Sequence, residues 1–210
     1  MQFNKKLISI ISVQKKHGEK FMDIASLNND HIVLEAQLRE NYGKVVYSHK
    51  TQEKCADILS KQHKLIKNSQ VILAALITTG LLVRIFQGKD WALIASTILS
   101  AMQFGFTAFL KEYNLGETIQ KHSTAALELF DIREKYLSLL TDMKLNILST
   151  EMIIGKRDQL HEALTRTYKG SPRTFGAAYK AAQKALQVGE ELTFTDKEID
   201  KFLPPALRKS

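Results

Sequence analysis

The chain has 210 residues, of which 44% are hydrophobic and 25% charged, a composition that excludes a disordered or collagen-like protein. It contains only 3 prolines and 10 glycines, which argues against a many-stranded β-sandwich or barrel and favours long helices. The single cysteine excludes an intrachain disulfide and a cysteine cluster for metal, and the net charge of +8 is spread over both ends, without the dense basic patch typical of nucleic-acid-binding proteins.

Residues 1–30 are treated as an N-terminal extension. Two lysines and the apolar stretch 7–13 imitate the start of a signal peptide. However, Lys15 and Lys16 follow at once, and no small-residue cleavage motif is present. We therefore expect a short amphipathic or strand-like extension, to which the sequence assigns no role.

Residues 31–66 are predicted to form a helix that begins near Asp30. The segment lacks proline and contains only one glycine. Its apolar residues recur at roughly helical spacing: Leu34, Leu38, Tyr42, Val45, Cys55, Ile58 or Leu59, and Leu65 or Ile66. Cys55 is interpreted as a core residue of this helix, because nothing in the sequence provides the low-pKa setting of a reactive thiol.

Two uncharged runs in the middle of the chain predict two membrane helices, at about residues 67–86 and 91–110. Asn68 to Val83 is one run of 16 residues, and Trp91 to Leu110 is another of 20. A bilayer core of about 30 Å needs roughly 20 helical residues. The short polar turn 87–90 makes the two helices antiparallel neighbours. A helical hairpin buried inside a soluble bundle is the alternative.

The residues that flank these runs fit a membrane interface. Long basic side chains can reach the headgroups from the ends of a span, and tryptophan favours the interface. The membrane-flanking residues are Lys67, Arg84, Lys89, Trp91 and Lys111. The outer ends of the two runs carry more basic residues than the turn between them. The lysines at the outer ends are Lys54, Lys61, Lys64, Lys67, Lys111 and Lys121. The positive-inside rule therefore predicts that both termini are cytoplasmic.

A polar stripe follows one face of the second run. Ser96, Ser100, Gln103 and Thr107 lie within a sector of about 60° on a helix. A shorter stripe on the first run ends at Thr78. Such a stripe either lets helices pack closely and form hydrogen bonds or lines a wet pore after oligomerisation. Both readings stay open from the sequence.

A coiled-coil-like seam follows the second run. We expect the helix to continue, with the seam at positions 115, 119, 122, 126, 129, 133, 136, 140, 143 and 147, eight of which are apolar. The exceptions are His122 and Arg133. They are expected either to pair with carboxylates in the bundle or to act as regulatory contacts that hold the helical arms in one state. Gly116 is expected to be a hinge or a close-packing site.

Residues 156–210 are predicted to form a tail of short helices. Lys156 to Tyr168 is amphipathic, and Ser171-Pro172 indicates the start of a second helix. Thr195 and Glu198 form a capping box for a third helix, which Pro204-Pro205 ends.

The sequence contains no motif for catalysis. It lacks a phosphate-binding glycine loop. His161 begins a zinc-protease-like pattern, but Thr165 stands where the second histidine would be. The six histidines are scattered without ligand spacing. We therefore expect no enzyme activity, no catalytic residue, no cofactor and no metal site.

The chain resembles the SLATT domain, a SMODS and SLOG-associating two-transmembrane effector domain. The resemblance covers residues 30–205 and lies in the stretches LSKQHKLIKNSQVILAALITTGLL (59–82) and YNLGETIQKHSTAALELFDIREKYLSLLTDM (113–143). The tail, with SPRTFGAAYKAAQKALQ and FTDKEIDKFLP (171–187 and 194–204), is similar to family 5 of that group. The resemblance implies an all-α fold: a two-transmembrane hairpin in a core of residues 31–155, long cytoplasmic arms and a helical tail of residues 156–210.

The same resemblance implies a membrane effector of a prokaryotic antiphage or conflict system. Such proteins are expected to oligomerise in the bacterial inner membrane, perforate it and cause cell suicide or arrest. The partners implied are the lipid bilayer, further copies of the chain, and an operon-encoded nucleotide-signal synthase, nucleotide sensor or reverse transcriptase; no specific nucleic acid is expected. The alternatives are a non-conducting membrane anchor or scaffold that recruits a cytoplasmic partner, and a soluble helical-bundle module.

Overall fold

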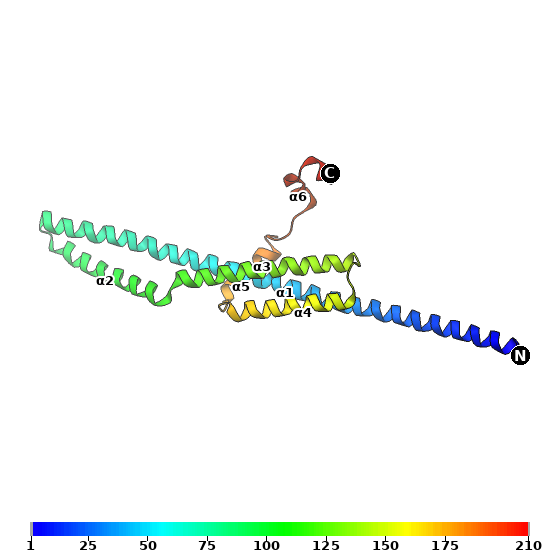
Figure 1. The fold of residues 1–210 in the computed structure, drawn as a ribbon. Coiled ribbons are helices and arrows are strands. Elements are labelled where there is room, and N and C mark those ends of the chain that lie inside the picture. The colour runs from blue at the N-terminus through cyan, green and yellow to red at the C-terminus, as the bar shows by residue number, and fades with distance from the viewer. Residues whose placement is uncertain (1, 210) are drawn as a thin grey trace. The chain divides into compact units, whose positions relative to one another are not determined.

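The structure is a computed structural model that describes the backbone of residues 2–209 and the side chains of residues 30–209. Its elements are helices, with no β-strand within residues 2–209, which confirms the all-α fold (Figure 1). Helix α1 runs Gln2–Gln87. No proline precedes Pro172, so none removes a backbone donor from this helix. The strand-like alternative for residues 1–30 therefore does not hold, and the amphipathic alternative concerns side chains outside the described residues.

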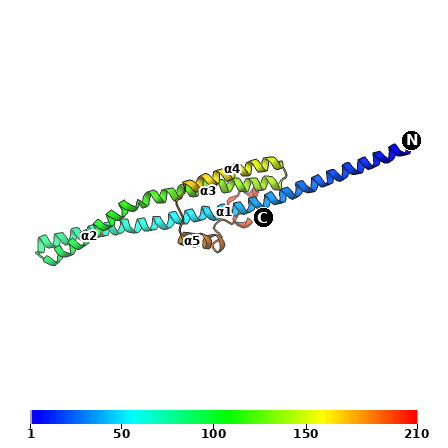
Figure 2. The ribbon, with the colours of Figure 1, turned by 90° about the horizontal axis from the view of Figure 1, so that it is seen from below.

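Helix α2 runs Asp90–Tyr113 and returns alongside the end of α1 (Figures 1 and 2). The turn between them requires a left-handed residue, and Gly88 adopts this conformation with φ 69°. Its amide donates to the carbonyl of Arg84 at 3.0 Å, which closes the last turn of α1. The predicted hairpin is thus present, with its two uncharged runs on neighbouring antiparallel helices.

The helix that follows the second run does not continue as expected. Helix α2 ends at Asn114, which has a left-handed φ of 38°, and α3 begins anew as Leu115–Lys144. Asparagine adopts this conformation more readily than most residues. Its side-chain amide bonds to Glu117, and its carbonyl accepts from the amide of Thr118 at 3.2 Å. Asn114 therefore ends one helix and begins the next.

Three helical elements and a 3₁₀ turn complete the chain: α4 (Thr150–Gly170), α5 (Gly176–Gln187), α6 (Asp196–Phe202) and η1 (Pro205–Leu207). The helix start predicted at Ser171-Pro172 is wrong, because residues 171–175 are not helical and α5 begins after Phe175. The Pro172 carbonyl instead accepts from Gln52 Nε2 at 3.4 Å. The capping box is confirmed, since Thr195 and Glu198 bond to each other's backbone amides.

One compact unit comprises residues up to Val46 together with Leu129–Lys169. Segments of α1, α3 and α4 contribute its core, and α3 and α4 run side by side (Figure 2). The core residues are Leu34, Leu38, Val45, Leu129, Ile132, Tyr136, Leu139, Met143, Ile153, Leu160 and Leu164. Charged residues on the outer faces form pairs at i,i+4 spacing, such as Lys44–Glu40 at 2.7 Å and Lys135–Asp131 at 2.6 Å. The unit is thus an ordinary amphipathic three-helix bundle.

The seam predicted along the third helix is confirmed as far as Met143. Its positions from 115 to 143 are buried or half-buried, and Tyr136 is fully buried. Ile147 is the exception, with 63% of its surface exposed, because α3 ends at Lys144 and the helical spacing is lost. A seam read from spacing is therefore reliable only while the helix lasts.

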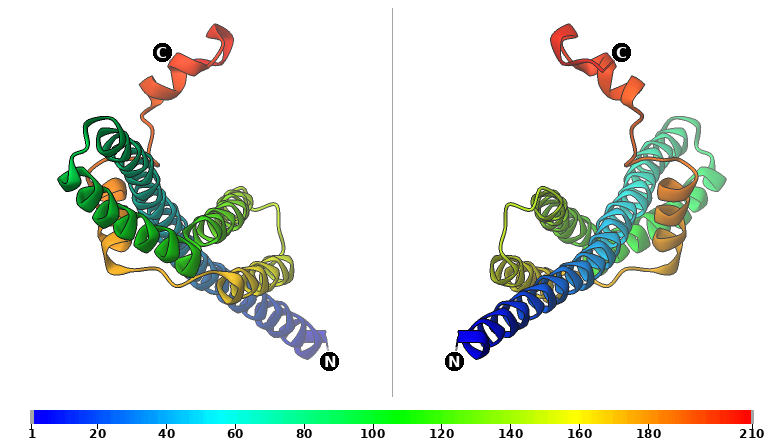
Figure 3. Two further views of the ribbon diagram at one scale, coloured as in Figure 1. Left: turned by 90° about the vertical axis from the view of Figure 1, so that its left-hand side faces the viewer. Right: turned by 90° about the vertical axis from the view of Figure 1, so that its right-hand side faces the viewer.

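The second compact unit comprises Tyr47–Glu128 and Gly170–Ser210. It contains the hairpin, and α5 packs at an angle against α1 (Figure 3). The buried face of α5 consists of Ala178, Ala182 and Ala185, which permit a close approach. At its edge the rings of Tyr47 and Tyr179 stack with centroids 6.2 Å apart.

Candidate functional site

The hairpin of α1 and α2 carries apolar side chains on its outside. Only Ala92 and Ser96 are buried in α2. Large apolar residues of both helices are exposed by 40% or more: Val71, Ile72, Leu76, Leu81, Leu82, Ile85, Phe86, Trp91, Leu93, Ile94, Ile98, Met102, Phe104 and Phe109. Both helices are long and apolar enough to cross a membrane, and almost none of their apolar windows is buried. An exposed apolar surface of this extent is suited to lipid rather than to water.

The two limbs of the hairpin stay in antiparallel contact over a long distance. Cross-limb pairs step away from the turn in regular order: Arg84 with Asp90, Gly80 with Ser96, Gln70 with Thr107, His63 with Gly116, and Gln52 with His122. The last two pairs lie beyond the uncharged runs. The pairing that begins in the apolar segment therefore extends into the polar part of the same unit.

The closest approach of the two limbs is at Gly80. A Cβ placed there would clash with Ser96 Oγ and lie 3.3 Å from the carbonyl oxygen of Ala92, so any larger residue would force these neighbours to shift. Ser96 Oγ donates to Ala92 O at 2.8 Å and lies 3.3 Å from Ile77 O on the other limb. Small residues and such bonds are what hold helices together in lipid.

The predicted polar stripe is divided between two surfaces. Ser96 is buried and Gln103 is half-buried between the limbs, whereas Ser100 and Thr107 are exposed. Thr107 Oγ1 accepts from Gln70 Nε2 at 3.1 Å and donates to the carbonyl of Gln103 at 3.0 Å. Thr78, on the other limb, is exposed, and its hydroxyl donates to Ala74 O at 2.9 Å. Ser96 thus packs inside the hairpin, and the function of the exposed members stays a prediction.

The turn gathers three of the residues expected to flank the membrane, namely Arg84, Lys89 and Trp91. Arg84 donates to the Gly88 carbonyl at 2.9 Å and forms an ion pair with Asp90 at 3.0 Å. Its guanidinium is therefore held at the turn, as required for a charge at the end of a span. Lys89 and Trp91 are exposed beside it. Lys67 and Lys111 are exposed at the other end of the hairpin.

His122 has a different partner from the one expected. It is 2% exposed, and its Nδ1 lies 2.5 Å from Gln52 Oε1, so an amide rather than a carboxylate binds it. Burial lowers the pKa of His122, which favours the neutral ring. Because an amide oxygen only accepts, Nδ1 is the donor. The Gln52 amide nitrogen in turn donates to Pro172 O, so one buried amide connects α1, α3 and the segment before α5.

Arg133, in the three-helix bundle, pairs with a carboxylate as expected. Its Nε and Nη2 donate to Glu134 Oε1 at 2.9 and 2.7 Å. The guanidinium also lies 4.7 Å from the centre of the Phe130 ring. A regulatory role for His122 or Arg133 stays a prediction.

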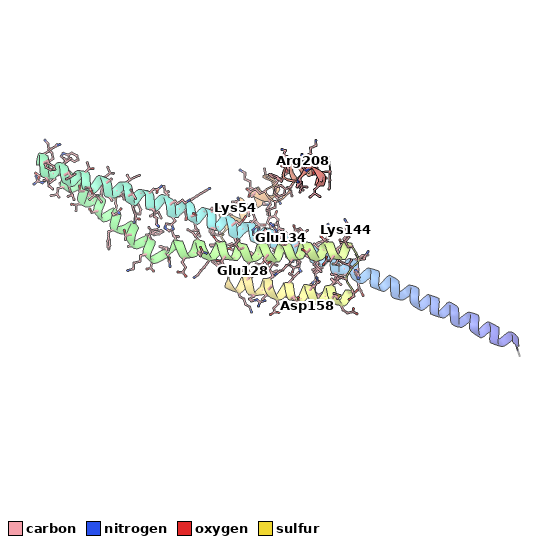
Figure 4. The ribbon with its side chains drawn as sticks, turned by 45° about the horizontal axis from the view of Figure 1, so that its top comes forward. Lys54, Glu128, Glu134, Lys144, Asp158 and Arg208 are labelled. Carbon is pink, nitrogen blue, oxygen red and sulfur yellow. The ribbon has the colours of Figure 1, made fainter. Side chains whose placement is uncertain are left out.

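Sequence reasoning missed the ion pairs that hold the segment after α5. Lys50 Nζ lies 2.9 Å from Glu53 and 2.7 Å from Glu191, and Lys54 lies 3.1 Å from the same Glu191 oxygen (Lys54 is labelled in Figure 4). Burial alone would lower the pKa of Lys50, but the bonds from Glu191 and Glu53 outweigh it and raise the pKa. Bonds from Lys50 and Lys54 lower the pKa of Glu191. No local pattern marks Glu191, because its partners lie far away in the sequence.

Cys55 is fully buried on α1, as predicted, and burial raises the pKa of its thiol. This is the opposite of the setting that activates a cysteine. Gly116 lies beside His63, since a Cβ at the glycine would meet His63 Cε1 at 3.6 Å. The break in the helix lies two residues earlier, at Asn114.

Residues 34–198 match the profile of the family described as SMODS and SLOG-associating 2TM effector domain family 4. The chain belongs to this family. The SLATT domain suggested by the sequence is therefore confirmed, whereas the matching family is number 4 and not number 5. The searches of curated proteins and of solved structures returned no match.

The family description agrees with the geometry of the hairpin. The SLATT domain has two transmembrane segments, and α1 and α2 each contain one helix suited to crossing a membrane. The SLATT protein described here is accordingly a membrane protein with an effector domain associated with SMODS and SLOG systems. SLATT is named as an effector domain and not as an enzyme family.

Proposed function

We propose that this SLATT protein is a defence effector that oligomerises in the inner membrane of a prokaryotic cell and perforates it, which kills or arrests the cell. The observation that carries the proposal is the hairpin with apolar side chains outside and Ser100 and Thr107 exposed among them. The Thr107 hydroxyl is hydrogen-bonded within the hairpin, whereas the Ser100 hydroxyl forms no hydrogen bond among the described residues. A hydroxyl exposed to lipid in this way is costly unless a neighbouring helix or water covers it. Assembly would provide that cover.

A pore requires several copies of the chain. Two helices cannot enclose a conducting path, so the path must form between hairpins. Ser96 and Gln103 are turned toward the other limb of the same hairpin. We therefore propose that Ser100 and Thr107 lie at the contact between hairpins in the closed assembly. Ser96 would line the path only in a state in which the two limbs of a hairpin separate.

We further propose that both termini face the cytoplasm. The lysines that precede α1's apolar run and follow α2's outnumber Lys89 and Arg84 at the turn. The arms and tail would then meet a cytoplasmic activator, such as an operon-encoded nucleotide-signal synthase, nucleotide sensor or reverse transcriptase. The action needs no catalysis, because dissipating ion gradients is sufficient.

Leakage is the direct test of the pore. The wild-type protein should release potassium from expressing cells and a small dye from liposomes, and Ser100→Leu should reduce release while inserting normally. Ile98→Leu, which changes an exposed apolar residue on another sector, is the matched control and should leak like wild type. Toxicity without leakage would reject the pore and leave a non-conducting anchor or scaffold.

Cysteine accessibility locates the lining. In a Cys55→Ala background, single cysteines replace residues 96, 98, 100, 103, 107 and 109. A water-soluble reagent should label positions 100 and 107 in the toxic state and spare 98 and 109. Equal protection at every position would contradict a lining role for the stripe.

A further inference from the structure

The lysine and arginine side chains described in α1, in residues 30–87, fall into two groups, those with an ion-pair partner and those without one. Those far from the apolar run, and Arg84 at the turn, are neutralised by carboxylates: Arg39 by Glu35, Lys44 by Glu40, Lys50 by Glu53 and Glu191, Lys54 by Glu191, and Arg84 by Asp90. Lys61, Lys64 and Lys67 form no ion pair among the described side chains, although all three are exposed. The unpaired group therefore lies just before the apolar run.

The sequence explains why Lys64 and Lys67 are unpaired. No aspartate or glutamate occurs between Asp57 and Asp90, so Lys64 and Lys67 have no carboxylate within one helical turn. On α2, Lys111 is in the same situation. Its one acidic neighbour, Glu112, is adjacent in sequence and points to a different side of the helix. Lys111 also forms no ion pair among the described side chains.

These lysines lie at one level of the hairpin. Gln70 bonds to Thr107 at 3.1 Å, and His63 adjoins Gly116, so the two contacts bracket the same slice of both limbs. Lys64 and Lys67 lie within the slice on α1, and Lys111 lies within it on α2. We name Lys64, Lys67 and Lys111 the lysine collar. With Glu112 as the acid in the slice, the collar is net positive.

The collar is continuous with a surface made for lipid. Exposed apolar side chains start within the collar at Leu65, which is 68% exposed, and continue beyond it with Val71 at 71% and Ile72 at 61%. At the level of the collar, Tyr113 is 61% exposed and its ring packs at a tilt against that of Phe109, with centroids 4.5 Å apart. An aromatic ring with a polar tip beside unpaired ammonium groups is the arrangement expected at the headgroup level of a bilayer.

We propose that the lysine collar binds the phosphate headgroups of anionic phospholipids in the leaflet around that end of the hairpin. A membrane supplies phosphates in a plane at the level where the three ammonium groups lie. A nucleic acid would need a run of free cations leading away from that plane. Beyond the collar on α1, Lys61 is unpaired too, but the cations that follow, Lys54 and Lys50, are held by Glu191. The binding depends on the hairpin spanning a bilayer and not on pore formation.

Lipid preference of the full chain is the test. The protein is placed in nanodiscs that contain phosphatidylglycerol and phosphatidylcholine, and the lipids it retains on release are counted by native mass spectrometry. Each lysine at an anionic surface is worth roughly a fivefold preference. Wild type should prefer phosphatidylglycerol, and the triple variant Lys64→Gln/Lys67→Gln/Lys111→Gln should lose at least about tenfold of that preference.

The matched control removes the same charge elsewhere. Lys144, Lys169 and Lys180 are exposed and form no ion pair among the described side chains, and their triple glutamine variant should keep the wild-type preference. Single collar variants, each expected to lose several-fold, replace the triple variant if it does not insert. Replacement by arginine should retain the preference.

Three outcomes would overturn the proposal. The collar variant could keep the wild-type preference, or the control variant could lose as much as the collar variant. A labelled single-stranded oligonucleotide could also bind to the wild-type protein in phosphatidylcholine nanodiscs and not to the collar variant, with lipid preference unchanged. That result would assign the collar to nucleic acid. The lipid readout is independent of leakage, so the pore and the collar can fail separately.

Discussion

The three-helix bundle and the hairpin use the same kind of helix in opposite ways. In the bundle, Leu38, Leu129 and Ile153 are fully buried, and charged residues cover the outside. In the hairpin, Phe86 and Phe104 are exposed by 80% and 75%, and the residues buried in α2 are the small Ala92 and Ser96. The solvent, and not the helical backbone, decides which side chains go between helices.

The difference implies different forces. Burial of large apolar groups from water stabilises the bundle, at about 25 cal/mol per Å². Between helices in lipid that force is absent, because the lipid is as apolar as the interface, and close contact of small residues takes its place. A deletion of side-chain volume should therefore damage the bundle most, and an addition of volume at the contact should damage the hairpin.

The largest effect is expected from Leu129→Ala in the bundle. Truncating a fully buried leucine should cost about 2–5 kcal/mol, because it leaves a cavity. Ile98→Ala, on the exposed surface of the hairpin, is the control and should cost less than about 1 kcal/mol in detergent. Denaturant unfolding followed by circular dichroism measures both. Equal losses would mean that the two regions do not differ as described.

A smaller effect is expected from Gly80→Ala in the hairpin. The new methyl group meets Ser96 Oγ and crowds the Ala92 carbonyl, so overpacking should cost about 1–3 kcal/mol. Ser96→Ala in the same chain removes the clashing oxygen and should restore most of the loss. Thermal unfolding in detergent measures each variant. If Ser96→Ala gives no rescue, the two residues do not touch in the folded hairpin.

The smallest of the three effects is the pH dependence due to His122. Its folded pKa lies below the ordinary 6.5, so between these two values the unfolded chain binds more protons than the folded chain. Stability should therefore fall as the pH falls below the ordinary His pKa of 6.5. The carboxylates with lowered pKa values, Glu40, Glu117, Glu191 and Glu198, act at lower pH, below their ordinary 4.5.

His122→Gln should flatten the decline above pH 5, because a glutamine amide can still donate to Gln52 but does not titrate. His161→Asn, at an exposed position of α4, is the control and should leave the decline unchanged. Unfolding free energies measured at several pH values compare the variants. A decline that persists in His122→Gln would assign it to another group.

Patterns that repeat within one helix were predictable from the sequence. The uncharged runs gave the hairpin, three- and four-residue spacing placed Leu129, Tyr136 and Met143 in the core, and Thr195 with Glu198 formed the capping box. Each depends on residues within a few turns of one another. The collar also belongs to this class, since the absence of acids from Asp57 to Asp90 is visible in the sequence.

Features that join distant residues were not predictable. Nothing local selects Gln52 over a carboxylate as the partner of His122, or Glu191 as the partner of Lys50. At Ser171-Pro172 the local pattern predicted a helix start, but in the structure this segment is not helical and the Pro172 carbonyl accepts a hydrogen bond from Gln52. The helix break at the left-handed Asn114 was equally unpredictable, because asparagine also occurs inside helices.

The two limbs of the hairpin differ in mechanical continuity. Beside the collar, α1 passes without interruption, whereas the other limb changes from α2 to α3 at Asn114. An unbroken helix transmits torque and thrust along its axis, while a single residue outside the helical conformation acts as a joint that lets the axis change direction. The hairpin thus pairs one continuous helix with a limb that is interrupted at Asn114. A pull on α3 can be taken up as bending at Asn114, whereas α1 offers no such break before Gly80 and the turn at Gly88.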